Sequence, residues 1–332
     1  MENLIKSQKA LNRETARKLL FVIFGAVLLW NVGTRLSLIV RANDIVQGNN
    51  GLVPSAMKAM ESEFINVKLP LEMNKEVEYW MHHFSTLKRE EFLEQLSRAG
   101  LYSEMIRTKL IEYQMPEELL YLAQIESGYM TRARSVSSAS GVWQFMGPTA
   151  RQYGLRIDGY VDERRDPVRA TDAAVNYLRE LYERYESWYL AAAAYNAGPT
   201  RVSSLLRQHT DGRVGDENLY WEIIDHLPKE TAQYVPKLLA VTYLAKYGQI
   251  SGVSESTPYV YDDVWTPGGI ILSDLAQRLG MPSSVIEDLN PHLIRGITPP
   301  GEIYLLRVPV GSSTKVVSVV GFPERMVHFA DD

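Results

Sequence analysis

Apolar side chains recur at intervals of three and four residues between Met73 and Gly248, and almost nowhere in this stretch do they alternate as in a strand. This spacing is typical of amphipathic helices, so the stretch is predicted to be almost entirely α-helical. The expected helices are two or three between Met73 and Leu110, one that leads to Glu126, a long one introduced by Asp166-Pro167, one that begins near Trp188, and one from Thr231 to Tyr247.

A short helix that ends at Gly128 places one carboxylate in an unusual setting. Leu119, Leu122 and Ile125 form the apolar stripe of this helix. Glu126 falls beside the stripe and near the negative end of the helix dipole. Both features disfavour the ionised carboxylate, and a protonated carboxyl group near neutral pH suits general-acid cleavage of a glycosidic bond. The alternative is a solvated glutamate at a helix end.

The pattern changes beyond Gly252. Residues 251–258 are rich in Ser, Thr and Gly and are interpreted as a linker. The elements expected after it are a strand, two helices and a strand, at Tyr259-Val260-Tyr261, Leu272 to Leu279, Ser284 to Leu289 and Ile303 to Val308. We therefore expect a small α+β module at residues 259–312, and one more strand or a tail at residues 313–332.

Basic residues precede an apolar run at the amino terminus. Lysines and arginines between Lys6 and Lys18 are followed by apolar residues from Leu19 to about Val40, with Arg35 as an interruption. This order predicts export, with the chain after residue 42 across the membrane. Residues 1–42 are a cleaved signal peptide or an anchor in the inner membrane, and the length of the run favours the anchor. Residues 43–72 are expected to be a linker.

The composition of the chain argues against several classes of function. The 332 residues carry 35 basic and 40 acidic side chains and a formal charge of −5, which offers no general attraction to nucleic acid. The absence of cysteine excludes disulfides, thiolate metal sites and a lipid-modified cysteine. The 6 histidines show no spacing typical of metal ligands, so neither a metal nor another cofactor is expected.

Two later segments add candidate binding groups. Residues 131–140 form a loop of small and polar side chains, and Gln144, four residues beyond it, can both donate and accept hydrogen bonds to a sugar. Tyr195 follows four alanines that allow close helix packing, before Gly198 ends the helix. Each has a structural alternative, because a glutamine can satisfy buried backbone and a tyrosine can belong to the core.

Taken together, ordered motifs of the chain resemble the soluble-type lytic murein transglycosylases. The motifs are Glu126-Ser127, Ser135, Gly141-x-x-Gln144 with Met146, Ala194-Tyr195-Asn196-Ala197-Gly198, and Glu230-Thr231-x-x-Tyr234-Val235. The resemblance covers residues 73–250 and implies a lysozyme-like, mainly helical domain. It also implies cleavage of the bond between N-acetylmuramic acid and N-acetylglucosamine in the glycan strands of peptidoglycan, in the periplasm or cell envelope. Partners from the cell-wall machinery would fit such an enzyme.

The resemblance implies that Glu126 is the sole catalytic acid and base. It would protonate the leaving oxygen and then accept the proton of the C6 hydroxyl, whose oxygen attacks C1 and forms a 1,6-anhydro sugar. The residues that match substrate-binding positions are Ser135, Gln144, Met146, Tyr195, Asn196 and Tyr234.

Two features of the sequence bear on this reaction. A hydrolase with two carboxylates needs a second Asp or Glu about 5 to 9 Å from the first. The sequence offers none that we can place: the nearest candidates, Asp158, Asp162, Glu163 and Asp166, lie in a charged loop and are interpreted as solvated or capping residues. Met130-Thr131 stands where relatives often have Asn-Pro.

The carboxy-terminal module resembles LysM-type peptidoglycan-binding modules. Leu275-Ala276-x-x-Leu279-Gly280 and Ile286-x-x-Leu289-Asn290-Pro291 match the two helices of such a module, whereas Pro267-Gly268-Gly269 departs from its usual turn. The module either binds glycan or is a structural cap.

Three functions follow. The first is an exported lytic transglycosylase, the second a lysozyme-like hydrolase in which water replaces the C6 hydroxyl, and the third a wall-binding scaffold without turnover. The setting of Glu126 argues against the scaffold.

Overall fold

Local signals in the sequence begin and end the helices. The side chain of Asn74 accepts a hydrogen bond from the Val77 amide, and that of Asp166 accepts from the amides of Val168 and Arg169, with proline at the next position. Gly128 ends its helix in the left-handed conformation, at a φ of 59°. The helix that was predicted to end at Gly128 and the one predicted to begin after Asp166 are therefore present.

The computed structural model describes residues 68–248, 252–254 and 256–321. Contacts along the chain separate residues 1–65 from a second unit, residues 66–332. The predicted export segment and most of the predicted linker before residue 73 lie outside the described residues. Among the residues described here, no helix combines the length and the apolar character needed to cross a membrane.

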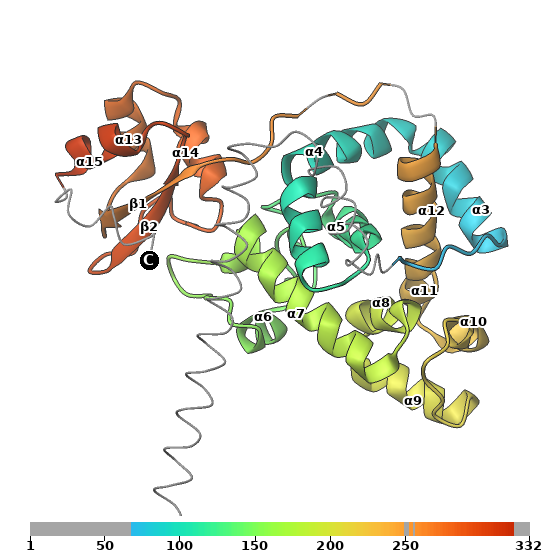
Figure 1. The fold of residues 1–332 in the computed structure, drawn as a ribbon. Coiled ribbons are helices and arrows are strands. Elements are labelled where there is room, and N and C mark those ends of the chain that lie inside the picture. Colours follow the sequence, from blue (N-terminus) through green and yellow to red (C-terminus); the bar gives the residue numbers. More distant parts are fainter. Residues whose placement is uncertain (1–67, 249–251, 255, 322–332) are drawn as a thin grey trace, which may run out of the picture. The chain divides into compact units, whose positions relative to one another are not determined.

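Ten α-helices make up the part from residue 68 to residue 248 (Figure 1). They are α3 (Lys75–His82), α4 (Arg89–Glu112), α5 (Leu120–Ser127), α6 (Gly147–Gln152), α7 (Pro167–Tyr185), α8 (Trp188–Ala197), α9 (Pro199–His209), α10 (Asn218–Ile223), α11 (Lys229–Ala232) and α12 (Tyr234–Tyr247). Short 3-10 turns and one π-helical turn join some of them, and the described part of this region contains only isolated bridges in place of strands. The prediction of a mainly helical region is confirmed.

One predicted boundary is wrong. The helix expected from Thr231 to Tyr247 is two helices, because α11 ends at Ala232 and α12 begins at Tyr234, with Gln233 between them. Glu230 before the break and Tyr234 after it both line the cleft described below.

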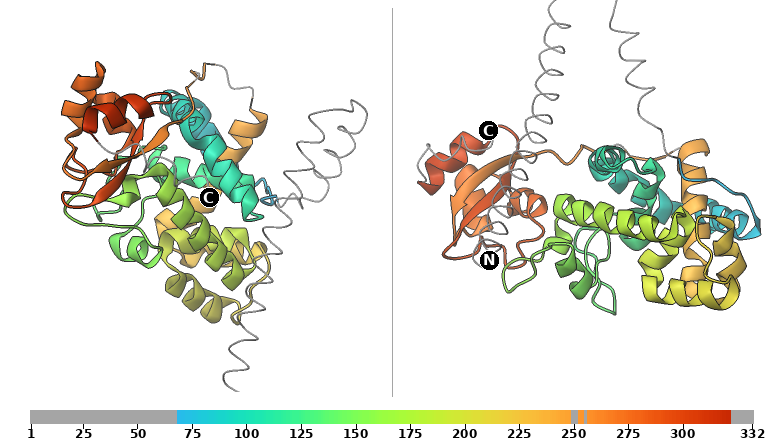
Figure 2. Two further views of the ribbon diagram at one scale, coloured as in Figure 1. Left: turned by 60° about the vertical axis from the view of Figure 1, so that its left-hand side comes forward. Right: turned by 60° about the horizontal axis from the view of Figure 1, so that its bottom comes forward.

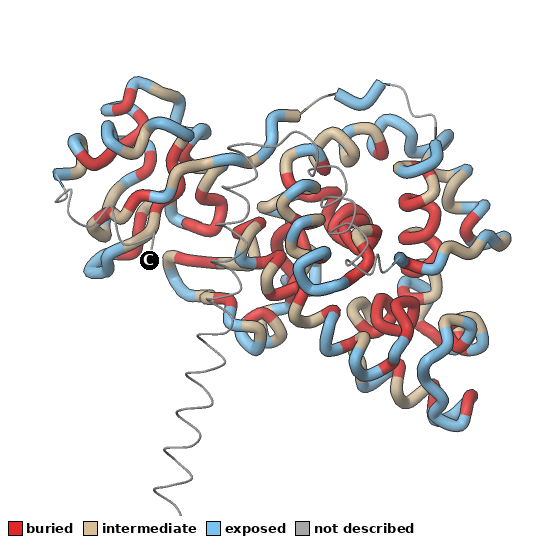
Figure 3. The backbone as a smooth tube through the Cα atoms, viewed as in Figure 1, coloured by how far each residue is buried: buried red, intermediate tan, exposed pale blue. Residues whose placement is uncertain are grey.

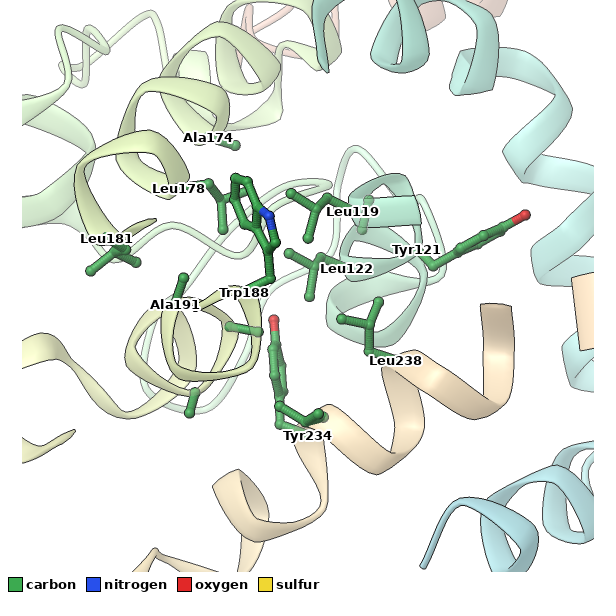
Figure 4. Packing of buried hydrophobic residues seen from close by; sticks show 14 of the residues in the cluster. Leu119, Tyr121, Leu122, Ala174, Leu178, Leu181, Trp188, Ala191, Tyr234 and Leu238 are labelled. Carbon is green, nitrogen blue, oxygen red and sulfur yellow. The ribbon is translucent and has the colours of Figure 1, made fainter. Parts of the chain in front are cut away.

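An alanine-rich helix occupies the centre of the core. Every residue of α8 from Trp188 to Ala194 is buried, so α7, α9 and α12 pack closely around it (Figure 3). Figure 4 shows Trp188 between Leu178 of α7 and Leu122 of α5. Full burial of a leucine such as Leu122 contributes about 1.5–3 kcal/mol to folding, so these contacts hold α5 firmly.

The carboxy-terminal module pairs β1 (Asp262–Pro267) with β2 (Ile303–Val308) in an antiparallel sheet, in which Val264 lies opposite Leu306. Three helices pack with the strands around a separate core: α13 (Leu272–Leu279), α14 (Ser283–Leu289) and α15 (Ser313–Val320) (Figure 2). The two helices and the second strand agree with the predictions, and the mainly α fold with a small α+β module is confirmed.

Two predictions for this module are wrong. Tyr259-Val260-Tyr261 is not a strand, because the Tyr259 amide donates to the Leu101 carbonyl and the strand begins at Asp262. The segment after Val310 contains α15 in place of a strand or tail, because Val316 and Val317 bury their side chains in the module core.

A buried ion pair links the module to the start of α7. Arg307 of β2 donates to the Asp166 carboxylate over 2.9 Å, and both side chains are almost completely buried. The Arg307 guanidinium and neighbouring donors hold the pKa of Asp166 below its usual value, although burial opposes this effect.

Candidate active site

A cleft of about 530 Å³ lies among α5, α6, α7, α8, α11 and α12. All of the residues that the resemblance implies for the site contribute to its walls: Glu126, Ser135, Gln144, Met146, Tyr195, Asn196 and Tyr234. Their roles remain predictions, but the fold brings together residues that are more than a hundred positions apart in the sequence.

Glu126 lies one residue before the end of α5 and is only partly exposed. The Tyr234 hydroxyl donates a hydrogen bond to its Oε1 atom over 2.6 Å. In Figure 4 the Tyr234 ring points from α12 into the space between α5 and α8. This contact holds the carboxyl group in one orientation in the cleft.

Burial is the main cause that raises the pKa of Glu126, to about 7. The negative charge of Glu230 raises it further, whereas the Tyr234 hydrogen bond and the positive charge of Lys237 lower it. A carboxyl group with this pKa can hold a proton near neutral pH and also release it, as an acid and base in turn must do.

A tight loop carries Gln144 to the cleft. Gln144 has a φ of 47°, and its side-chain nitrogen Nε2 donates to the Gly141 carbonyl over 2.8 Å. A Cβ atom on Gly141 would lie 1.7 Å from the Arg164 carbonyl oxygen, so only glycine fits there. The Ser127 hydroxyl donates to the Val142 carbonyl over 2.8 Å, which joins this loop to the helix that carries Glu126.

Tyr195 supports the same loop. Its hydroxyl donates to the Trp143 carbonyl over 2.7 Å, and its ring packs near Phe145 and Tyr177. The structural alternative for the hydroxyl is therefore realised, while the ring still lines the cleft. Burial and the nearby Glu126 charge keep the pKa of Tyr195 well above its ordinary value, so the hydroxyl stays protonated.

The remaining predicted residues differ in how firmly they are held. The Ser135 hydroxyl accepts from the Ala139 amide and contacts the Ser137 hydroxyl. The Asn196 side-chain oxygen accepts from the Thr231 hydroxyl over 2.7 Å. Met146 is 42% exposed, so its thioether is open to a ligand.

The sequence analysis did not include two charged residues of the cleft. Glu230 provides a second carboxylate there, which corrects the expectation that none could be placed. Lys237, the only basic residue among the described lining residues, extends over the Trp80 ring, with Nζ 4.5 Å from its centre. Lys237 follows Tyr234 by three positions on α12, and this helical spacing was the available signal.

The four acidic residues of the charged loop have structural partners. Asp158 accepts from the amides of Tyr160 and Val161, and Asp162 pairs with Arg164. Glu163 accepts from the Arg156 amide, and Asp166 caps α7. None of them lines the cleft of Glu126. Among the described ranges, no group of three or more His, Asp or Glu side chains could hold a metal ion.

Comparisons with known proteins agree with the predicted resemblance. Residues 104–214 match the family model described as Transglycosylase SLT domain, and residues 261–320 match the one described as Lytic transglycosylase MltD, LysM-like domain. The second match identifies the carboxy-terminal module by sequence as LysM-like.

Named relatives with similar sequences are also lytic murein transglycosylases. Membrane-bound lytic murein transglycosylase D of Escherichia coli is 36% identical over 169 residues, which cover 50% of this chain and 36% of that protein. Soluble lytic murein transglycosylase of Escherichia coli is 28% identical over 152 residues, which cover 44% of this chain and 23% of the relative. The chain thus spans about a third or less of the length of these relatives.

Among solved structures, an inactive mutant of lytic transglycosylase Slt from Pseudomonas aeruginosa is 25% identical, with a TM-score of 0.36. The match covers 45% of this chain and 25% of the solved chain.

Proposed function

We propose that this chain, which carries a transglycosylase SLT domain followed by a LysM-like domain of the MltD type, is a lytic transglycosylase of peptidoglycan. It would cleave the bond between N-acetylmuramic acid and N-acetylglucosamine without consuming water. The observation that carries the proposal is Glu126, a carboxyl group with a pKa of about 7 that Tyr234 holds in a cleft lined by all the matched residues.

Glu126 acts in both halves of the proposed reaction. Its proton passes to the glycosidic oxygen as the bond from C1 of N-acetylmuramic acid to that oxygen breaks. The carboxylate then accepts the proton of the C6 hydroxyl while O6 forms a bond to C1. The products are a free hydroxyl on the leaving sugar and a 1,6-anhydro ring, and the protonated Glu126 is restored.

Other residues of the cleft have supporting roles. Tyr234 donates to Glu126 and stabilises the carboxylate that forms after the first proton transfer. Ser135, Gln144, Met146 and Asn196 lie where they can contact the sugar rings and N-acetyl groups, and Tyr195 holds the loop of Gln144 in place.

Mass analysis of products from sacculi tests this function. Residues 43–332 are incubated with sacculi beside the Glu126→Gln variant. We expect anhydro-muropeptides from the first protein and none from the second. If neither protein released products but both still bound sacculi, the result would favour the wall-binding scaffold.

Glu230 favours a hydrolase as the second candidate. It supplies another carboxylate to the cleft, and a pair of carboxyl groups can activate water. The hydrolase would release reducing ends, and Glu230→Gln would abolish its activity. For the transglycosylase we expect Glu230→Gln to keep the anhydro product.

The surroundings of the enzyme belong to the same proposal. Export by residues 1–42, with the inner membrane as anchor and the periplasm or cell envelope as location, follows from the sequence of that segment. A helical domain at residues 73–250, glycan binding by the module, and partners in the cell-wall machinery are further parts of it.

A further inference from the structure

A second, smaller depression of about 250 Å³ lies beside the catalytic cleft. α3 and α12 pack against each other (Figure 1). One face of α3 and the segment where α11 meets α12 line the depression. Its lining residues are Lys75, Glu76, Tyr79, Trp80, Ala232, Gln233 and Pro236. The matched part of the SLT family model, residues 104–214, includes none of them.

Lys237 joins the two hollows. It lines the cleft of Glu126, yet its ammonium lies 4.5 Å from the centre of the Trp80 ring, which lines the depression. Glu230 and Tyr234 face the cleft, whereas Gln233, between them in sequence, faces the depression. Lys237 with Trp80, and the segment from Glu230 to Tyr234, therefore lie between the two hollows and border both.

The chemistry of the depression suits a sugar. Tyr79 is 60% exposed and packs edge to face on Trp80, with ring centres 5.3 Å apart. An exposed aromatic ring held by a neighbour can pack against the C–H face of a pyranose. Lys75, Glu76 and Gln233 add donors and acceptors for hydroxyl and N-acetyl groups at the edge.

We propose that the glycan strand extends from the catalytic cleft past Lys237 into this depression, where Tyr79 binds a further saccharide unit. The inference rests on the proposed function, because it extends the strand that the cleft would hold. Tyr79 here adds affinity for long strands and takes no part in bond cleavage.

Affinity as a function of glycan length tests the inference. The probes are N-acetylglucosamine oligomers from the disaccharide to the octasaccharide, measured by calorimetry with full-length Glu126→Gln protein. In that background we expect Tyr79→Ala to weaken binding of the longest oligomers about fivefold and to leave the shortest unchanged. Tyr79→Phe keeps the ring and is expected to keep the affinity.

Tyr247→Ala is the matched control, because Tyr247 is a 68% exposed tyrosine at the far end of α12 and lines neither hollow. Unchanged affinity of Tyr79→Ala for the long oligomers would overturn the inference. So would an equal loss for short and long oligomers, or the same loss in Tyr247→Ala. These titrations do not depend on products, so a wild-type enzyme that forms no anhydro sugar would refute the proposed reaction and leave this result intact.

Discussion

At the scale of single residues, the cleft is an arrangement of charges around one carboxyl group. Burial disfavours ionised Glu126, and three groups adjust this effect: Glu230 on α11, and Tyr234 and Lys237 on α12. Tyr195 on α8 also faces Glu126, as a neutral hydroxyl group. None of these side chains belongs to α5, the helix that carries Glu126, so each can be substituted without changing that helix.

The first prediction concerns the pH dependence of activity. In the proposed reaction Glu126 must start protonated, so kcat/KM should fall as the pH rises through about 7. Lys237 lowers the pKa of Glu126, so Lys237→Met should raise that pKa and move the fall to higher pH. Initial rates on sacculi from pH 5 to 9 measure both curves; an identical midpoint in the two proteins would contradict this role of Lys237.

The second prediction concerns stability. The pKa of Glu126 rises from 4.5 to about 7 on folding. As the pH increases, Glu126 therefore loses its proton at a lower pH in the unfolded chain than in the folded protein. Burial of Glu126 therefore lowers the free energy of unfolding at high pH. The loss is absent below pH 4.5, grows between the two pKa values and reaches on the order of 3 kcal/mol above pH 7. Glu126→Gln removes this loss.

Urea unfolding at pH 4 and pH 8 measures the effect. We expect Glu126→Gln to be more stable than the wild type at pH 8 and about equally stable at pH 4. A gain of the same size at both values would show that ionisation is not its cause.

At the scale of elements, tight packing of loops places the binding groups. The segment from Gly141 to Gln144 is held by Ser127 on one side and Tyr195 on the other. Gly141 packs directly on the backbone at Arg164, which leaves no space for a side chain.

The third prediction compares two glycines. Gly141→Ala must displace backbone and should destabilise the protein by about 3 kcal/mol or more, with loss of activity. Gly154 has the same φ of 82°, but a Cβ atom there would meet nothing within 4 Å. Gly154→Ala should cost only about 1 kcal/mol, for its backbone conformation alone. Thermal unfolding of both variants measures their losses of stability, and equal losses would contradict the steric explanation.

The elements that the sequence predicted well are those with local signals. Asp166-Pro167 and Gly128 mark helix ends through their own backbone preferences, which tertiary contacts reinforce. The strand at Tyr259 was wrong because that tyrosine packs on Tyr102 of α4, a contact that local pattern does not contain. The valines of α15 favour a strand locally, yet burial in the module core makes them helical.

In the candidate site, too, the sequence predicted the residues that local motifs mark and missed those that only tertiary packing brings together. The order of the motifs predicted Glu126 and the matched binding residues as site residues, and all of them line the cleft. Lys237 had no motif to mark it, and Glu230, although part of a quoted motif, was not recognised as a second carboxylate in the cleft. The proximity of both to Glu126 depends on how α12 packs against α5 and how α11 packs against α8 and α12, which is a tertiary property.

At the scale of the described molecule, the Asp166–Arg307 pair joins the helical part to the module. Removing one partner of a buried ion pair leaves the other charge buried and unpaired. The exposed pair of Arg132 and Asp288 also joins the two parts, but it lies in solvent.

The fourth prediction uses this contrast. Arg307→Met should lower the free energy of unfolding by about 3–5 kcal/mol, whereas Arg132→Met should change it by less than about 1 kcal/mol. Chemical denaturation followed by tryptophan fluorescence measures both losses. Equal losses would mean that burial of the first pair has no special effect.

The buried alanines of α8 limit which sequences can form this fold. Ala191 to Ala194 are fully buried, and α7, α9 and α12 pack against α8, so a larger residue would clash and a glycine would loosen the helix. This part of α8 is therefore expected to tolerate few substitutions, and new ligand preferences should evolve through the surface loops and α3. In a library of all single substitutions, we expect Ala191 to Ala194 to be the least tolerant positions and Tyr79 and Met146 to be among the most adaptable.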